Sequence, residues 1–269
     1  MLIIIIITLL SSCDKKEMLE VHIIDVGQGD SILIQTPSNK KILVDSGDED
    51  SERIIKSYLK KEKINSIDIV IATHPDSDHI GSLDYIVKKF KISNIYMTNQ
   101  SVNTSCYRNL IQACNDKNLT PNYLYKGDTI TIDEHTEILV LSPSYIQDDN
   151  NLNSIVFNLK YKNKSFLFTG DCEKSNEIDI INSFDLEDID FLKVAHHGSS
   201  SSSSPEFIKE ISPDVAVISC GYKNQYGHPH QSTIDSLSSN NVTTYRTDIN
   251  GDMIFYSDGN TIITKNKYK

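Results

Sequence analysis

The 269-residue sequence is poor in glycine, proline and long apolar runs, and each shortage excludes a class of protein. With only 11 glycines and 7 prolines, it is neither collagen-like nor of low complexity. Its one continuous apolar run covers residues 2–10, which excludes a polytopic membrane protein. Short runs of isoleucine, valine and leucine recur along the chain and exclude full disorder. The sequence therefore predicts a globular protein with one large domain or two small ones.

Positive charge is also scarce. Lysine and arginine total 26 against 37 aspartates and glutamates, which gives a formal net charge of −11. Such a chain does not attract nucleic-acid phosphates through its overall charge, and this disfavours a general nucleic-acid binder. A nuclease remains compatible with the composition, because clustered carboxylates can be metal ligands whose charge the bound ions cancel.

The five cysteines do not form a CxxC pair, which disfavours a zinc ribbon. Cys13 belongs to the N-terminal segment discussed next. The other four leave between zero and two disulfides open; they are Cys106, Cys114, Cys172 and Cys220.

Residues 1–13 read as a bacterial lipoprotein signal peptide. The run LIIIIITLL (2–10) is too short to cross a hydrocarbon core of about 30 Å but suits the apolar region of a signal peptide. The following Leu10-Ser11-Ser12-Cys13 resembles a lipobox, in which Cys13 becomes the lipid-carrying first residue. This predicts an extracytoplasmic protein that is secreted or meets the membrane only through an anchor at Cys13. The alternative is a buried first strand in a cytoplasmic protein, because a basic segment before the run is missing.

Residues 18–269 alternate between short β-rich runs and amphipathic segments and predict one catalytic domain. In the first expected helix, 50–63, the residues Ile54, Ile55, Tyr58 and Leu59 are expected on one side. Strands followed by mixed strand–helix segments occur in two halves. This order predicts an α/β fold, an αββα four-layer sandwich of two mixed β-sheets flanked by helices. Further helices are expected at 82–90, 104–116, 173–183 and 231–239.

Four potential metal ligands fall within six residues of the segment ATHPDSDHIG (72–81): His74, Asp76, Asp78 and His79. The segment connects an apolar strand to a helix, and a turn can direct alternate side chains at a shared point. Two imidazoles and two carboxylates suit Zn²⁺, Mn²⁺ or Fe²⁺. The alternative is a solvated polar loop, in which these four side chains have no clear local role.

Further ligands are expected at the ends of other apolar strands. Asp171 follows a sharp turn at Gly170, although it could instead cap the helix 173–183. His196 and His197 precede a glycine at the end of an expected strand, 189–197. The six serines that follow, 199–204, are interpreted as a loop of the site rather than as a flexible linker.

Other polar residues have two interpretations each. His228 and His230, in the segment GHPH, either contact substrate or simply lie in a loop. Asp25, Asp30 and Asp45 either orient metal ligands or accept hydrogen bonds from backbone N–H groups in tight turns.

Six segments, taken in chain order, resemble the metallo-β-lactamase superfamily. The most similar branch is the C-terminal hydrolase domain of ComEC competence proteins and its stand-alone relatives. The resemblance covers about 250 residues from Leu19 and implies a metal-dependent hydrolase. The segments are DVGQGDSILI, ILVDSG, ATHPDSDHIGS, LFTGDCE, LKVAHHGSS and YGHPH.

The resemblance implies two divalent ions, zinc or manganese, held by His74, Asp76, Asp78, His79, Asp171 and His196. The first two ligands serve one ion, the next two serve the other, Asp171 bridges both, and His196 completes the second. His196 is preferred to His197 because it aligns with the superfamily's single late histidine. The usual third histidine of the first ion has no evident match, and Asn-Leu-Asn-Ser (151–154) occupies its region.

Two such ions lower the pKa of a bound water, and the resulting hydroxide attacks a phosphorus or carbonyl centre. Asp78 is expected to accept the proton, and His197 or His230 to donate one to the leaving oxygen or bind a phosphate. The carboxylate-rich ligand set favours phosphate oxygens, and the resemblance implies a phosphodiesterase or nuclease, with single-stranded DNA as a candidate substrate.

Two other functions remain open. One is hydrolysis of a small ester, a lactone or a phosphorylcholine-type envelope substrate, and the other is a non-catalytic metal-binding surface protein. A basic groove beside the site would indicate a polymer, and acidic surroundings would indicate a small substrate. The sequence leaves the oligomeric state open.

Overall fold

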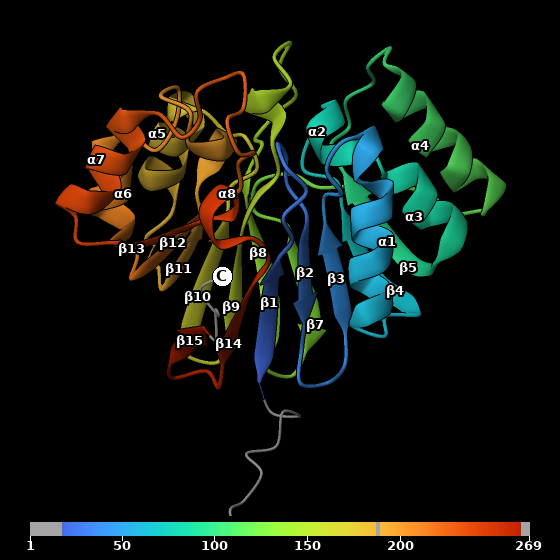
Figure 1. Cartoon of the computed structure of the whole chain (residues 1–269), viewed down its shortest axis with the longest axis horizontal. Coiled ribbons are helices and arrows are strands. Elements are labelled where there is room, and N and C mark those ends of the chain that lie inside the picture. The colour runs from blue at the N-terminus through green and yellow to red at the C-terminus, as the bar shows by residue number, and fades with distance from the viewer. Residues whose placement is uncertain (1–17, 187–188, 265–269) are drawn as a thin grey trace, which may run out of the picture.

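In the computed structural model, which describes residues 18–186 and 189–264, two β-sheets face each other and helices cover both outer sides (Figure 1). The predicted αββα sandwich is therefore confirmed. The predicted signal peptide, 1–13, lies outside the described residues. No helix among the described residues is long and apolar enough to cross a membrane.

The first sheet has eight strands and carries the segment with four potential ligands. Its early strands pair antiparallel, whereas β3 to β6 pair in parallel because helices connect them. The strand order is β15 (Ile262–Thr264), β14 (Met253–Ser257), β1 (Leu19–Ile23), β2 (Ile32–Gln35), β3 (Lys41–Val44), β4 (Ser66–Ile71), β5 (Lys91–Met97) and β6 (Asn122–Tyr123). The helices are η2 (Glu49–Ser51), α1 (Glu52–Lys61), α2 (Ser77–Ile80), α3 (Leu83–Lys89) and α4 (Ser105–Asp116).

The second sheet has seven strands and carries the later candidate ligands. Its order is β13 (Thr243–Arg246), β12 (Val215–Ile218), β11 (Phe191–Lys193), β10 (Lys164–Phe168), β9 (Val156–Tyr161), β8 (Thr136–Ser142) and β7 (Thr129–Asp133). The helices are η3 (Asn151–Asn153), α5 (Lys174–Ser183), η4 (Ala195–Gly198), α6 (Pro205–Ile211), α7 (Gln231–Ser239) and α8 (Thr247–Asn250).

Apolar side chains fill the space between the sheets, because alternate residues of each strand face inward. From the first sheet these include Val21 and Ile34, and from the second Phe157 and Phe168, all at most 1% exposed. Separate apolar clusters lie beneath the helices of each side. The site at the sheet edge is thus supported by a rigid core on both sides.

Two local expectations were wrong. In α1, Ile55, Tyr58 and Leu59 are buried as expected, but Ile54 is 42% exposed, one residue away from the buried stripe. The expected strand 189–197 is shorter: β11 ends at Lys193 and the chain continues into η4. The reason is that both histidines of this segment adopt positive φ angles near 50°, which a strand cannot accommodate.

Candidate metal centre

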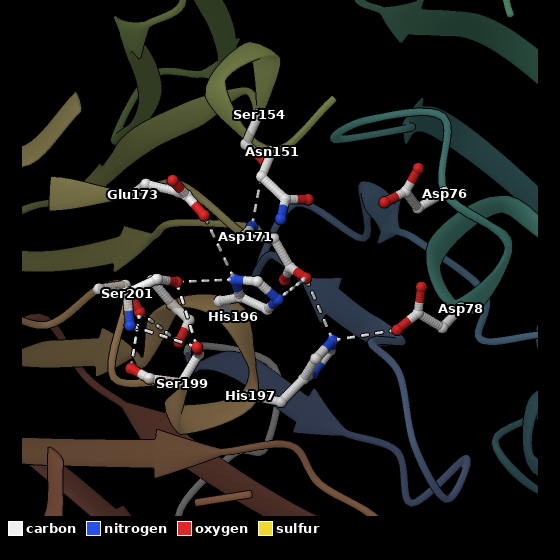
Figure 2. Close-up of polar contacts among 12 residues, drawn as sticks. Asp76, Asp78, Asn151, Ser154, Asp171, Glu173, His196, His197, Ser199 and Ser201 are labelled. Carbon is white, nitrogen blue, oxygen red and sulfur yellow. Dashed lines mark hydrogen bonds and ion pairs between the residues drawn. The ribbon is translucent and has the colours of Figure 1, made fainter. Parts of the chain in front are cut away.

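Loops at the carboxyl ends of strands from both sheets bring four side chains together at one edge of the sandwich. One ligand atom from each of Asp78, His79, Asp171 and His197 lies within 4.8 Å of the other three. His79 Nε2 lies 3.2 Å from Asp171 Oδ1, and His197 Nε2 lies 3.3 Å from both Asp171 Oδ2 and Asp78 Oδ2. Figure 2 shows the Asp171 carboxylate in contact with the rings of both His196 and His197.

Asp171 is placed by a tight turn after β10. Gly170 has a φ of +51°, and a Cβ at this position would lie 3.1 Å from Thr73 and 3.2 Å from Ser154. The backbone N–H of Asp171 donates to Ser154 Oγ at 3.1 Å (Figure 2). Glycine therefore lets this turn approach the loop after β4, which leads to the candidate ligands Asp78 and His79.

The two late histidines have different surroundings. The His197 ring is buried and points at the Asp171 carboxylate, whereas the His196 side chain is 23% exposed. His196 Nε2 is 3.8 Å from Asp171 Oδ2, and its Nδ1 faces Ser201 Oγ at 3.2 Å (Figure 2). The structure thus places His197, and not the expected His196, in the four-residue cluster. Ser201 belongs to the serine run, which forms a loop beside the site.

Fixed partners hold the Nδ1 atoms of the imidazoles. His79 Nδ1 is 2.8 Å from Asp45 Oδ2 and His197 Nδ1 is 2.9 Å from the Ser219 carbonyl oxygen, so each Nδ1–H donates. His74 Nδ1 lies 3.1 Å from Thr73 Oγ1, whose hydroxyl donates to Asp45 at 2.6 Å. Each ring therefore turns Nε2 toward the cluster, which is the arrangement that metal-binding histidines use.

The donor set fits a bound cation. Within the described part of the chain, the Nε2 atoms of His74, His79 and His197 and Oδ1 of Asp171 are buried without a hydrogen-bond partner. Buried polar atoms normally have hydrogen-bond partners, and four that lack one and face the same space are suited to a bound cation. Imidazole nitrogens and carboxylate oxygens are the ligands of Zn²⁺ and Mn²⁺.

The protonation equilibria also show that the site attracts positive charge. Burial lowers the pKa of His79, but the nearby carboxylates of Asp171 and Asp45 outweigh burial and hold this pKa well above its usual value. For His197 the same balance of burial against Asp171 raises the pKa to about 10. Burial raises the pKa of Asp171, yet His197 and His79 together hold it well below the ordinary range. Divalent cations would supply the same positive charge.

A buried ion pair lies on the other side of these histidines. Lys193 Nζ, from β11, is 2.6 Å from Asp30 Oδ2, and the two side chains are 1% and 2% exposed. Asp30 also lies 3.8 Å from His197 Nδ1 and 3.9 Å from His79 Nδ1. Lys193 thus balances the charge of a carboxylate that faces both rings.

On the other side of Asp171, His74 is fully buried and Asp76 is 39% exposed. His74 Nε2 lies 3.7 Å from Asp76 Oδ2 and 4.0 Å from Asp171 Oδ2. Asp76 accepts a hydrogen bond from Asn150 Nδ2 at 2.5 Å. The next residue, Asn151, has a buried Oδ1 without a hydrogen-bond partner among the described residues. Figure 2 shows its amide beside Asp171, on the side of Asp76.

The segment GHPH leaves two interpretations open for its histidines, contact with substrate or a position in a loop, and the structure places His228 beside His196 and His197. Its ring centroid is 5.7 Å from that of His196 and 6.4 Å from that of His197. Burial, with the neighbouring His197 and His196, lowers the pKa of His228 to about 4. His230 instead accepts a hydrogen bond at Nδ1 from the Ser200 backbone N–H, at 2.9 Å.

Comparisons with known proteins agree with this geometry. The family model described as the metallo-beta-lactamase superfamily matches residues 24–222. The chain is 32% identical over 250 residues to ComE operon protein 3 of Bacillus subtilis. This alignment covers 86% of this chain and 32% of that protein. The chain is also 32% identical to recombination protein 2 of Haemophilus influenzae, over 83% of this chain and 27% of that one. The chain therefore spans about a third of the length of these relatives.

Among solved structures, the metallo-beta-lactamase fold protein YhfI of Bacillus subtilis is similar. The superposition has a TM-score of 0.60 and covers 89% of this chain and all of that one, with 13% identity. At this level of identity the likeness establishes the fold alone.

Proposed function

Because the chain belongs to the metallo-beta-lactamase superfamily, we propose that its centre holds two divalent metal ions, zinc or manganese, and hydrolyses phosphodiesters. The observation that carries this proposal is that three imidazole nitrogens, none of which makes a hydrogen bond among the described residues, converge on the Asp171 carboxylate. The relative named for recombination supports a nucleic-acid substrate, and single-stranded DNA is the polymer we propose.

We assign the second ion to Asp78, His79 and His197, with Asp171 shared between the two ions. His197 takes the place that the sequence analysis gave to His196, because its Nε2 lies within 3.3 Å of both carboxylates. His196 stands at the mouth of the site, where Ser201 faces its Nδ1 and Nε2 remains directed toward Asp171.

We assign the first ion to His74 and Asp76, with Asn151 Oδ1 as the third ligand in place of the histidine that this sequence lacks. The segment after Asn150 is fixed at both sides, because Asn150 donates to Asp76 and Ser154 accepts from the Asp171 backbone. An amide oxygen is a weaker ligand than an imidazole for zinc, so we expect this ion to bind less tightly.

Divalent ions in such a site activate water and stabilise negative charge on phosphate oxygens. Around them, we expect Asp78 to accept a proton from the attacking water, since its side chain is 30% exposed and faces the cluster. We expect His196 and the neutral His228 to contact the phosphate and its leaving oxygen. His230 then acts by holding the serine loop through Ser200.

The test compares bis-p-nitrophenyl phosphate and single-stranded DNA with a panel of lactones and esters, with Mn²⁺ and Zn²⁺ supplied separately. We expect phosphodiester hydrolysis that depends on added metal. Activity confined to lactones or carboxylic esters would contradict the proposal, and metal binding without hydrolysis of any ester would indicate a binding protein.

We further propose that the protein acts outside the cytoplasm, attached through a lipid on Cys13. A Cys13→Ser variant is expected to move from the membrane fraction to the soluble fraction of a bacterial host. Equal membrane association of both forms would contradict the lipid anchor.

A further inference from the structure

Two strongly exposed tyrosines lie on the loop 221–230, beside the metal centre. Tyr222 is 73% exposed and Tyr226 is 55% exposed. The Tyr226 ring stacks on the imidazole of His228, with centroids 5.6 Å apart and an interplanar angle of 23°. His228 in turn lies at 29° to the ring of His197. Rings in near-parallel planes therefore lead from a candidate metal ligand to an aromatic face in solvent.

A single side chain holds this loop together. Asn224 Nδ2 donates to the carbonyl oxygens of Gly221, at 2.9 Å, and His228, at 2.6 Å. Its Oδ1 accepts from the backbone N–H groups of Tyr226, at 3.1 Å, and His228, at 3.0 Å. These four bonds fix the Tyr226 backbone relative to His228, so the ring face is available without ordering the loop first.

Backbone contacts also anchor the loop on the segment that carries His197. The His230 backbone N–H donates to the Gly198 carbonyl oxygen at 2.9 Å, one residue after His197. A Cβ at Gly198 would lie 2.5 Å from the Cβ of Pro229, so the two segments are in close contact. The distance between the exposed aromatic face and the cluster is therefore set by backbone contacts.

One atom of this arrangement still lacks a partner. His228 Nδ1 is buried and makes no hydrogen bond within the described residues. The imidazole that carries it neighbours both the exposed Tyr226 ring and the His197 ring. The loop thus offers an aromatic face beside a polar ring that adjoins the candidate ligands, which together suit a planar ring joined to a polar linkage.

We propose that Tyr226, supported by His228, forms a stacking subsite for a nucleobase next to the phosphodiester that the centre cleaves. The inference rests on the proposed phosphodiesterase function. Base stacking on an aromatic side chain tolerates any sequence and needs no positive charge, which suits a chain of net charge −11. The subsite selects single-stranded nucleic acid, because bases within a duplex already stack on both faces.

The experiment measures the KM of the whole protein for a single-stranded oligonucleotide and for an abasic oligonucleotide of equal length. Stacking contributes about 1–3 kcal/mol per base, so we expect the KM for the abasic oligonucleotide to be roughly 5- to 150-fold higher. In Tyr226→Ala the ratio of the KM for the abasic oligonucleotide to the KM for the normal one falls close to one, and Tyr226→Phe restores the wild-type ratio. Tyr123→Ala, which removes a 46% exposed tyrosine from the edge strand β6, is the matched control and keeps the original ratio.

A second readout does not depend on turnover. A 2-aminopurine in the oligonucleotide should lose fluorescence on binding to the wild type and to Tyr226→Phe, but not on binding to Tyr226→Ala. Equal KM values for normal and abasic substrates, or equal quenching by all variants, would overturn the subsite. If no phosphodiester is hydrolysed, the proposed function fails, and the quenching comparison still decides whether the base stacks on Tyr226.

Discussion

At the scale of single residues, the centre depends on how each side chain is held. Asp171 has Oδ1 3.2 Å from His79 Nε2 and Oδ2 4.0 Å from His74 Nε2, so it lies between residues that we assign to the two different ions. Burial alone would favour its neutral form, but the two imidazoles hold its pKa far below the usual range. It is therefore a carboxylate in the folded protein, ready to bind cations.

Replacing this carboxylate is the most direct test of the centre. We expect Asp171→Ala to abolish turnover and to release at least one metal ion per chain, because both ions lose a ligand. Elemental analysis of the purified variant measures the loss. Asp179→Ala, which removes an exposed aspartate of α5, is the control and should keep both ions. Full metal content in Asp171→Ala would argue against the bridging role.

The two adjacent histidines give a sharper comparison. His197→Ala should lose the second ion, since it removes a buried nitrogen that faces Asp78 and Asp171. His196→Ala should keep that ion and lower the rate of ester hydrolysis. Metal titration by calorimetry distinguishes them. Loss of the ion in the His196 variant alone would restore the assignment based on resemblance.

Asn151 offers a similar test on the other side. Asn151→Ala should weaken binding of the first ion, whereas Asn151→His should strengthen it by supplying an imidazole nitrogen. The stoichiometry and affinity of Mn²⁺, measured by electron paramagnetic resonance, report both effects. Unchanged binding of both ions in Asn151→Ala would exclude this residue as a ligand.

At the scale of elements, the strand ends carry the ligands and the buried charges beneath them. Lys193 closes β11 immediately before the turn with the two histidines, and its ammonium pairs with Asp30 in the loop after β1. This pair joins a strand of the second sheet to a loop of the first sheet, beside the candidate metal centre. The pair is therefore expected to affect the free energy of unfolding through the contact between the two sheets.

Removing one partner of this pair should be costly. We expect Lys193→Met to lower the free energy of unfolding by about 3–5 kcal/mol, because it leaves the Asp30 carboxylate buried without its cation. Urea denaturation in the presence of a chelator measures this without a metal contribution. Lys40→Met breaks the more exposed pair with Asp68 and should cost at most about 1 kcal/mol. Equal effects of the two substitutions would contradict the structural role of Lys193.

At the scale of the whole molecule, the centre joins the two sheets. The loop after β4 belongs to the first sheet, and the turns after β10 and β11 belong to the second. Ions bound between them stabilise only the folded arrangement, since the ligands are far apart in an unfolded chain. Metal binding would thus be coupled to the stability of the whole sandwich.

Chelation should consequently lower the melting temperature. An ion present at 100 times its dissociation constant contributes about 2.7 kcal/mol, which corresponds to a shift of roughly 5–10 °C for a chain of this size. Differential scanning calorimetry with and without a strong chelator measures the shift. The Asp171→Ala variant should respond less, and an unchanged melting temperature of the wild type would argue against a structured metal site.

The sequence by itself determined the architecture and the places where ligands occur. Apolar strands that end in HPDSDH, in Gly170-Asp171 and in His196-His197 predict ligands at a sheet edge, because strand ends are where the chain turns toward the loops. The structure brings all of these segments to one edge. The alternation of strands and helices was likewise sufficient to predict the two sheets and their outer helices.

Only the tertiary structure decided which atoms meet. The left-handed backbone at His196 and His197 turns one ring inward and the other toward Ser201, and sequence spacing does not show such φ angles. Sequence spacing also does not show that His228 reaches the site, which it does because Asn224 and Gly198 fix its loop. Nor does it show the ion pair of Lys193, whose partner Asp30 is more than 160 residues away. Local patterns specify where a chain turns, but contacts between distant segments depend on packing of the complete core.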